Sequence, residues 1–357
     1  MSRVDAYARL LVEHCLDVQP GWQVLIRTQP ASRPLVEALV GRIAQRGAYA
    51  VLRLGFTLWP VDLVWASDAS PELLGELPEI DKFASDRMDA RVTIDAPENT
   101  RESVDLPAER RALAAQATSY FLRRTMSHEI PWVSCQYPTQ ALAQDAGLSL
   151  RHFEDTLYDA VLIDWAALEA TMRRNADRFD AAGEVRIVAP GTDLTLSLEG
   201  RNADVDGGRT NMPGGEFFYA PVEDSAEGVV HFSEFPSVNE GLEVTGVRLV
   251  FEGGRVVDAS AAGGEEHLFA NLDTDDGARR IGELGIGCNP GITRHMRNTL
   301  FDEKMAGTVH IALGASYTHI GGTNESALHW DLVKDLRDGG ELSCDGEVVQ
   351  RDGRWLL

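Results

Sequence analysis

The sequence predicts two domains, an α/β domain over residues 1–182 and a β-rich α+β domain over residues 183–357. The chain has 357 residues, about twice the length of a common domain. Short apolar strands alternate with amphipathic helices before residue 182, which is typical of a mostly parallel sheet covered by helices. After residue 183, strands with period-2 patterns follow one another through glycine-containing turns, as in antiparallel sheets.

Four short apolar runs are the expected strands of the first domain. They lie at residues 23–27, 50–54, 91–94 and 132–135. An apolar stripe over residues 35–43 predicts a helix between the first two strands, which we expect Ser32 to cap and Gly47 to end. A long helix is expected over residues 108–124, and one or two more over residues 150–178. No glycine-rich phosphate-binding motif follows these strands, so we expect no nucleotide site here.

Hairpins are the expected building blocks of the second domain. Three turns mark them, at Pro190-Gly191, Gly253-Gly254 and Asp345-Gly346. Strand-like segments lie on either side of each turn, which favours antiparallel pairing.

The composition argues against several classes of protein. A formal net charge of −23 argues against binding to nucleic acid or to an anionic membrane surface. There is no run of about 18 apolar residues, so no membrane span is expected. The N-terminus lacks the apolar core and cleavage site of a signal peptide, and the four cysteines are far apart. We therefore expect a cytoplasmic protein with reduced thiols.

Candidate metal ligands lie in two apolar segments near the C-terminus. These segments contain His310, Tyr317, His329 and Asp331. His329 and Asp331 are two residues apart, so in a strand they project from the same face. Imidazole and carboxylate groups bind divalent metals such as zinc, cobalt and manganese. For any one histidine, a hydrogen-bonded position in the core is the alternative interpretation.

Two glutamates further upstream stand in unusual surroundings. Glu216 follows a Pro-Gly-Gly turn and begins an aromatic strand, and Glu283 interrupts an apolar strand rich in glycine. A buried carboxylate needs a positive partner, so each glutamate is expected to form a salt bridge or to bind a metal. No complete H-E-x-x-H or G-x-S-x-G motif occurs, which argues against zincin and serine-hydrolase sites.

Several blocks of the sequence resemble the thermophilic-aminopeptidase family of metallopeptidases, which includes aminopeptidases T and S. The most specific blocks are NMPGGEFFYAP, DDGARRIGELGIG, LFDEKMAGTVHIALGASY and ESALHWDLV. Softer similarity, including YARLLVEHCLDVQPGWQVLIR, extends the resemblance over nearly the whole chain. The resemblance implies two divalent metal ions per chain (zinc, cobalt or manganese) and a homodimer. It places the ligands at Glu216, Glu283, His310, Tyr317, His329 and Asp331, with catalytic roles for Glu283 and Tyr317.

The activity that this resemblance implies is release of N-terminal amino acids from a peptide or small amide substrate. Two adjacent metal ions can activate a water and polarise the carbonyl that it attacks. Ring-opening dioxygenases of dihydroxypyridines resemble the same blocks, but they hold a single iron and have histidine at the position of Glu283. The glutamate therefore favours the hydrolase. A catalytically silent binding protein is the third reading, and it predicts the loss of a ligand position; none is lost.

Overall fold

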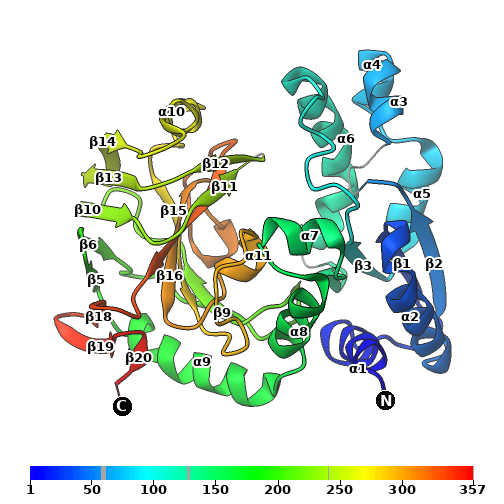
Figure 1. Cartoon of the computed structure of the whole chain (residues 1–357), viewed down its shortest axis with the longest axis horizontal. Coiled ribbons are helices and arrows are strands. Elements are labelled where there is room, and N and C mark those ends of the chain that lie inside the picture. The colour runs from blue at the N-terminus through cyan, green and yellow to red at the C-terminus, as the bar shows by residue number, and fades with distance from the viewer. Residues whose placement is uncertain (58–61, 127–128, 240, 357) are drawn as a thin grey trace. The chain divides into compact units, whose positions relative to one another are not determined.

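The computed structural model describes residues 1–57, 62–126, 129–239 and 241–356 (Figure 1). These residues form two compact units. The first unit contains Met1–Leu162 and Gly208–Pro213, and the second contains Ile163–Gly207 and Gly214–Leu357. The first has a parallel sheet with helices and the second is rich in antiparallel strands, so the predicted fold class is confirmed.

The first unit is built on a parallel sheet with the strand order β2-β1-β3-β4-β8. Its strands are β1 (Gln23–Thr28), β2 (Tyr49–Leu54), β3 (Ala90–Asp95), β4 (Trp132–Gln136) and β8 (Asn211–Met212). The first four are the predicted strands. The fifth is only two residues long and comes from the segment that returns from the second unit, which no local pattern in the sequence indicates.

Helices accompany the strands of the first unit. They are α1 (Arg3–Arg9), η1 (Leu10–Cys15), η2 (Pro30–Ser32), α2 (Arg33–Gln45), α3 (Leu63–Asp68), α4 (Pro71–Leu74), α5 (Glu79–Arg87), α6 (Ala108–Met126), α7 (Gln140–Asp145) and α8 (Leu150–Val161). Leu25 of β1 packs in one apolar cluster with Met88 and with Ala117 of α6. The predicted helices are present, and no helix of the described residues is long and apolar enough to cross a membrane.

The two ends of α2 differ from each other in how well they were predicted. Gly47 has a φ of 74° and follows the helix directly, as expected of a residue that ends it. Ser32 precedes the helix, but its side chain makes no capping hydrogen bond, so that prediction is wrong. The Ser32 hydroxyl instead donates to the carbonyl oxygen of Gln29 at 2.8 Å and lies 2.6 Å from the Thr28 hydroxyl.

The second unit contains an antiparallel eight-stranded sheet with the order β14-β13-β10-β6-β5-β18-β19-β20. Its strands are β5 (Glu184–Ala189), β6 (Thr192–Ser197), β10 (Glu227–Phe232), β13 (Val247–Glu252), β14 (Arg255–Ser260), β18 (Glu341–Cys344), β19 (Glu347–Arg351) and β20 (Arg354–Trp355). The predicted hairpins are its β5–β6, β13–β14 and β18–β19 pairs. A separate two-stranded sheet pairs β11 (Ser237–Asn239) with β12 (Leu242–Val244).

A five-stranded antiparallel sheet completes the second unit and has the order β17-β16-β15-β9-β7. We call it the site sheet. Its strands are β7 (Asp204–Asp206), β9 (Glu216–Tyr219), β15 (Ile281–Gly287), β16 (Thr308–Gly314) and β17 (His329–Asp335). The unit's remaining helices are α9 (Trp165–Asp180), α10 (Glu265–Leu272), α11 (Thr299–Asp302) and η3 (Thr318–Ile320). One apolar cluster joins the site sheet to the eight-stranded sheet, so both contribute to a single core.

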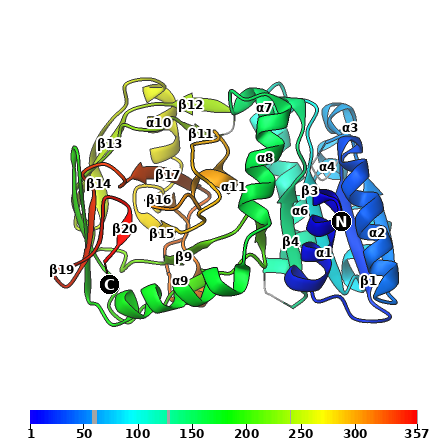
Figure 2. The same cartoon turned by 60° about the horizontal axis from the view of Figure 1, so that its bottom comes forward.

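Helix α9 lies in the second unit, whereas the sequence places the domain boundary after it, at residue 182. Figure 2 shows α9 along one side of this unit, close to β9. The Phe179 ring contacts the rings of Phe217 and Tyr219, and the Tyr219 hydroxyl donates to Asp180 at 2.7 Å. An amphipathic pattern shows that a helix has an apolar face, but it does not show which core that face joins.

Candidate metal centre

Five of the six predicted ligand residues project from one face of the site sheet. His329 and Asp331 lie on β17, His310 on β16, Glu283 on β15 and Glu216 on β9. Asp331 pairs with Ala312, and Ala312 pairs with Glu283 across the next ladder. Residues paired in this way share a face, as do residues two apart on one strand. The register therefore brings four strands together at one place, and the opposite face belongs to the apolar core.

Small residues between the ligands leave room for them on this face. Gly285 pairs directly with His310, and the imidazole lies over the glycine. A Cβ on Gly285 would lie 1.9 Å from Cε1 of His310, a distance that no side chain can tolerate. The imidazole thus approaches closely at this glycine-rich strand, where a side chain in place of Gly285 would block it.

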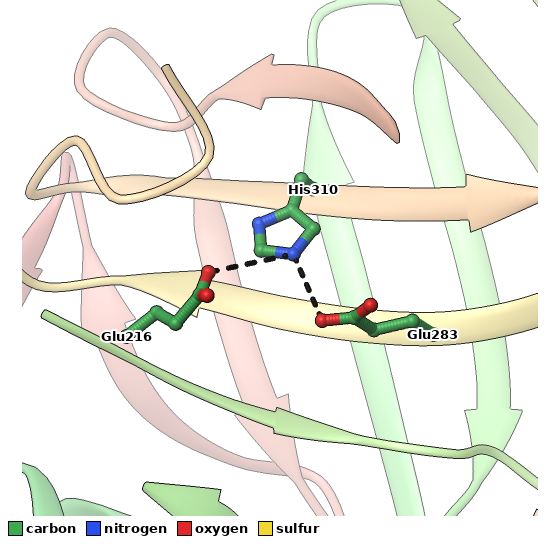
Figure 3. Close-up of side chains that lie close together, drawn as sticks. All are labelled: Glu216, Glu283 and His310. Carbon is green, nitrogen blue, oxygen red and sulfur yellow. Dashed lines mark hydrogen bonds and ion pairs between the residues drawn. The ribbon is translucent and has the colours of Figure 1, made fainter. Parts of the chain in front are cut away.

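The first group of possible ligands is His310 with two glutamates (Figure 3). Nε2 of His310 lies 3.2 Å from Oε1 of Glu283 and 3.6 Å from Oε2 of Glu216. All three residues are buried. Figure 3 shows the two carboxylates on either side of the ring, each aimed at the same nitrogen.

The second group shares Glu283 with the first and adds His329 and Asp331. Nε2 of His329 lies 3.4 Å from Oε2 of Glu283 and 3.9 Å from Oδ1 of Asp331. The two oxygens of Glu283 thus face different histidines, one in each group. His329 has 31% of its side chain exposed, against 1% for His310, so the second group lies nearer to solvent.

Backbone carbonyls fix the orientation of both imidazoles. Nδ1 of His310 lies 3.1 Å from the carbonyl oxygen of Glu303, and Nδ1 of His329 lies 3.0 Å from that of Ala315. A carbonyl oxygen can only accept, so Nδ1 carries a hydrogen in each ring. Nε2 is then the nitrogen left for a metal, an arrangement common among metal-binding histidines.

In the absence of a cation, protons on the two histidines balance the negative charge of the carboxylates in the two groups. Burial lowers the pKa of His310 and His329, but the hydrogen bonds to Glu283 and the negative charges of the nearby carboxylates together outweigh burial and raise the pKa values to about 10 and about 9. Burial raises the pKa of Glu283, but the same hydrogen bonds and the positive charges of the two histidines together outweigh burial and hold this pKa below its usual range. The two imidazolium protons occupy the side of Nε2 where a cation would bind.

Within the two ligand groups, two buried carboxylate oxygens lack a hydrogen bond from any described residue. They are Oε2 of Glu216 and Oδ1 of Asp331. Burial raises the pKa of Glu216 to about 8 and that of Asp331 to about 6, because nothing compensates their charge fully. Such unsatisfied acceptors are costly in a protein interior unless a cation binds them. The donor set therefore fits divalent metal ions.

Tyr317, the sixth predicted ligand residue, lies beside the second of these groups. It follows β16, and its ring centroid lies 5.5 Å from that of His329 and 5.2 Å from that of Phe218. Burial raises the pKa of the Tyr317 hydroxyl far above its usual value, and the charges of Glu283 and Asp331 raise it further. The hydroxyl is therefore protonated at neutral pH and can donate a hydrogen bond.

The sequence matches the family described as "Thermophilic metalloprotease (M29)" over residues 1–355. The chain belongs to this family. Aminopeptidase 2 of Geobacillus stearothermophilus is 29% identical in an alignment that covers 100% of this chain and 98% of that protein. The solved structure of wild-type AmpT from Thermus thermophilus has a TM-score of 0.85 and 26% identity, covering 99% of both chains. The family and enzyme class predicted from the sequence, a metallo-aminopeptidase, are thereby confirmed.

The dioxygenase of the alternative reading shares the fold with this M29 chain. The structure of 2,5-dihydroxypyridine dioxygenase from Pseudomonas putida has a TM-score of 0.59 and 14% identity, covering 100% of this chain and 98% of that one. Identity at that level shows a common fold alone. The choice between the two reactions therefore depends on the residues of the site.

Lys304 and Glu303 are residues near the M29 site that the sequence analysis did not single out. Nζ of Lys304 lies 3.0 Å from Oε1 of Glu216 and also contacts Oε1 of Glu303. Burial lowers the pKa of Lys304, but the negative charges of Glu216, Glu303 and Asp206 outweigh burial and raise it above its usual value. The signal in the sequence was the adjacent charged pair Glu303-Lys304 between two apolar runs. It did not identify Glu216 as the partner of Lys304, because Glu216 is distant in sequence.

Proposed function

We propose that the five residues on the site sheet hold a pair of divalent cations with which this metallo-aminopeptidase releases N-terminal amino acids from peptides. The observation that carries the proposal is the position of Glu283 between two groups of possible ligands. Each of its oxygens faces one histidine, so it can serve both groups at once. A carboxylate shared in this way is suited to holding two cations close together.

The proposed ligands divide into two sets. Glu216, Glu283 and His310 would hold one cation, and Glu283, His329 and Asp331 the other. Cations bound there would lower the pKa of a water and polarise the carbonyl of the scissile peptide bond. The carbonyls of Glu303 and Ala315 keep both Nε2 atoms directed toward the carboxylates, so the ligands are oriented before anything binds.

Other contacts to the substrate would come from groups at the exposed side of the sheet. The Tyr317 hydroxyl stays protonated, so it can donate a hydrogen bond to the oxygen that gains negative charge during hydrolysis. A free N-terminal amino group, in its uncharged form, could take a coordination position that these residues leave open. Binding of a free amino group favours removal of the first residue of a peptide over cleavage within it.

The ligand set supports a hydrolase over a mononuclear iron dioxygenase. A histidine at position 283 would give one neutral nitrogen, whereas the glutamate gives two oxygens and a negative charge. The five expected residues of the site sheet also argue against a catalytically silent binding protein, because all five face the same place.

The proposal also includes the finer expectations on metal, assembly and location. Zinc, cobalt and manganese all suit mixed imidazole and carboxylate ligands. A homodimer is carried over from the family resemblance, and a cytoplasmic location from the spacing of the cysteines in the sequence. The four cysteines are thiols in the structure, which fits a reducing compartment.

The test combines metal analysis with activity assays. The purified protein is stripped with a chelator, reloaded with zinc, cobalt or manganese, and assayed on aminoacyl anilides and short peptides. We expect close to two cations per chain and release of the N-terminal amino acid only after reloading. Oxygen uptake with 2,5-dihydroxypyridine serves as the parallel assay. A single bound iron with oxygen uptake and no peptide cleavage would mean that the dioxygenase reading is correct.

A further inference from the structure

Lys304 is a lysine with no exposed surface beside the proposed metal centre. It lies between helix α11 and strand β16, one residue after Glu303. Lysine is almost never fully buried unless its charge is paired. A second lysine, Lys334 on β17, is equally buried in the same unit and provides a comparison.

The surroundings of the two ammonium groups differ. Nζ of Lys334 donates to the carbonyl oxygens of Pro190 and His231 and to Oε1 of Glu234, none of which is a proposed metal ligand. Nζ of Lys304 is bound instead by two carboxylates, those of Glu216 and Glu303. One of these two carboxylates is a proposed ligand.

The contact with Lys304 makes the two oxygens of Glu216 unequal. Oε1 lies 3.0 Å from Nζ of Lys304, so it is held by a charge-assisted hydrogen bond. Oε2 accepts no hydrogen bond from the described residues and lies 3.6 Å from Nε2 of His310. The lysine therefore fixes the rotation of the carboxylate and leaves one oxygen directed into the ligand group.

We propose that Lys304 is a positioning residue that limits Glu216 to a single oxygen ligand and so keeps a coordination position open for water or substrate. The inference rests on the proposed pair of cations and adds a specific role for a residue outside the ligand set. A carboxylate can bind a metal through one or both oxygens. Once one oxygen is bound to a buried ammonium, only the other is available.

Removal of Lys304 should therefore have an effect opposite to that of removing a ligand. Without the ammonium, Oε1 of Glu216 is released and can bind the same cation as Oε2. The loss of a nearby positive charge also favours cation binding. We expect the cations to bind at least as tightly as before, while turnover falls because the open position is filled.

The experiment compares Lys304→Met with Lys334→Met, which removes the other fully buried lysine. Each variant is stripped and titrated with Co2+, and cation affinity, the visible absorption spectrum and kcat are measured. Cobalt absorbs less strongly as its coordination number rises, so the spectrum reports the number of ligands. For Lys304→Met we expect undiminished affinity, weaker absorption and a kcat at least about tenfold lower. For Lys334→Met we expect the wild-type spectrum.

The outcomes separate this inference from the proposed function. If the wild-type protein binds fewer than two Co2+ ions, the proposed metal pair fails and the inference fails with it. If the wild type binds two and Lys304→Met keeps both its spectrum and its kcat, only the role of Lys304 is refuted. A variant that loses affinity and activity together would show that Lys304 merely supports the fold, which also refutes it.

A third variant keeps the test decisive if Lys304→Met does not fold. Lys304→Gln retains an N–H donor of shorter reach without the charge, and it should keep Oε1 of Glu216 occupied. We expect its Co2+ spectrum to match the wild type and its kcat to exceed that of Lys304→Met. Lys304→Gln could instead absorb more weakly than the wild type while Lys334→Met keeps the wild-type spectrum. That result would mean that hydrogen bonding by residue 304 does not set how Glu216 coordinates the cation.

Discussion

Two clusters of polar side chains, one in each unit, differ in how their hydrogen bonds are satisfied. In the first unit, polar groups gather where β1, β3 and β4 end. The Ser32 hydroxyl donates to the carbonyl oxygen of Gln29, the Ala96 N–H donates to Oε1 of Gln29 at 2.6 Å, and Nε2 of Gln136 donates to Oδ2 of Asp95 at 3.3 Å. In the cluster on the site sheet, Glu216 and Asp331 each keep a buried oxygen that accepts no hydrogen bond from the part of the chain that the structure describes.

The difference separates a structural cluster from a binding site. Polar groups that bond to one another need no ligand and stabilise the chain around them. Buried acceptors that bond to nothing are unfavourable in the isolated fold, so their presence implies something positive that binds there. Substitutions that are chemically alike should therefore have different consequences in the two clusters.

The largest effect is expected from Glu283→Gln. The substitution removes the negative charge shared by both histidines and leaves the shape of the side chain almost unchanged. Loss of metal-assisted catalysis is worth several kcal/mol, so kcat/KM should fall by about a thousandfold or more. Steady-state assays on an aminoacyl anilide measure it, with Asp95→Asn in the other cluster as the matched control. Activity close to wild type in Glu283→Gln would contradict the shared role of this carboxylate.

Removal of the cations should destabilise the wild-type protein. We expect this effect to be smaller than that of Glu283→Gln on activity. A ligand at 100 times its Kd stabilises the state that binds it by about 2.7 kcal/mol, and the apparent Tm rises accordingly. We expect the Tm of the stripped protein to rise when zinc or manganese is added. Glu283→Gln should show a much smaller rise under the same conditions. Equal rises in both proteins would show that the cations bind elsewhere.

The affinity for cations should increase with pH. The pKa values of His310 and His329 are raised to about 10 and about 9, so at neutral pH in the metal-free protein both rings are imidazolium cations with a proton on Nε2 as well as on Nδ1. Their contribution to the stability of that protein is fully present below the ordinary histidine pKa and is lost above about pH 9. Each cation must displace the proton on Nε2 of the histidine that would bind it. Calorimetry in buffers of different ionisation enthalpy should detect proton release, and binding without it would contradict this charge assignment.

The smallest effect is expected from Asp95→Asn. Burial raises the pKa of Asp95 to about 6, and the hydrogen bond from Gln136 opposes this only in part. A raised carboxyl pKa means that stability is greatest when the group is protonated and falls as the pH rises from about 4 to about 6. The variant should therefore be more stable than the wild type at pH 7 by about 1–2 kcal/mol and equal to it at low pH. Urea unfolding at pH 4 and pH 7 measures the difference.

Local patterns in the sequence predicted features that depend on neighbouring residues. The Asp345-Gly346 turn was predicted from its residue types, and both residues have positive φ, 47° and 82°. The shared face of His329 and Asp331 followed from their spacing of two residues. Leu328, Trp330 and Leu332 are buried on the other side, as the same alternation predicts.

Features that depend on distant residues could not be predicted from periodicity. The pairing of Gly285 with His310, and of Ala312 with both Asp331 and Glu283, is set by strand register. Register follows from the whole pattern of apolar contacts, which a single strand does not contain. For the same reason, nothing around Lys304 identified Glu216 as its partner. The family resemblance indicated these residues without explaining how they meet.

The six residues Gly208–Pro213 belong to the first unit, but in the sequence they lie between two parts of the second unit. This order matters during synthesis. Within this segment, Met212 pairs with β4, its carbonyl oxygen accepts from the Tyr7 hydroxyl at 3.3 Å, and the Gly208 carbonyl accepts from Cys15. The sheet of the first unit is therefore complete only after residue 213 has left the ribosome. Glu216 emerges three residues later. The nascent chain thus reaches the first of its proposed metal ligands just as it finishes the other unit, and it acquires the remaining proposed ligands later.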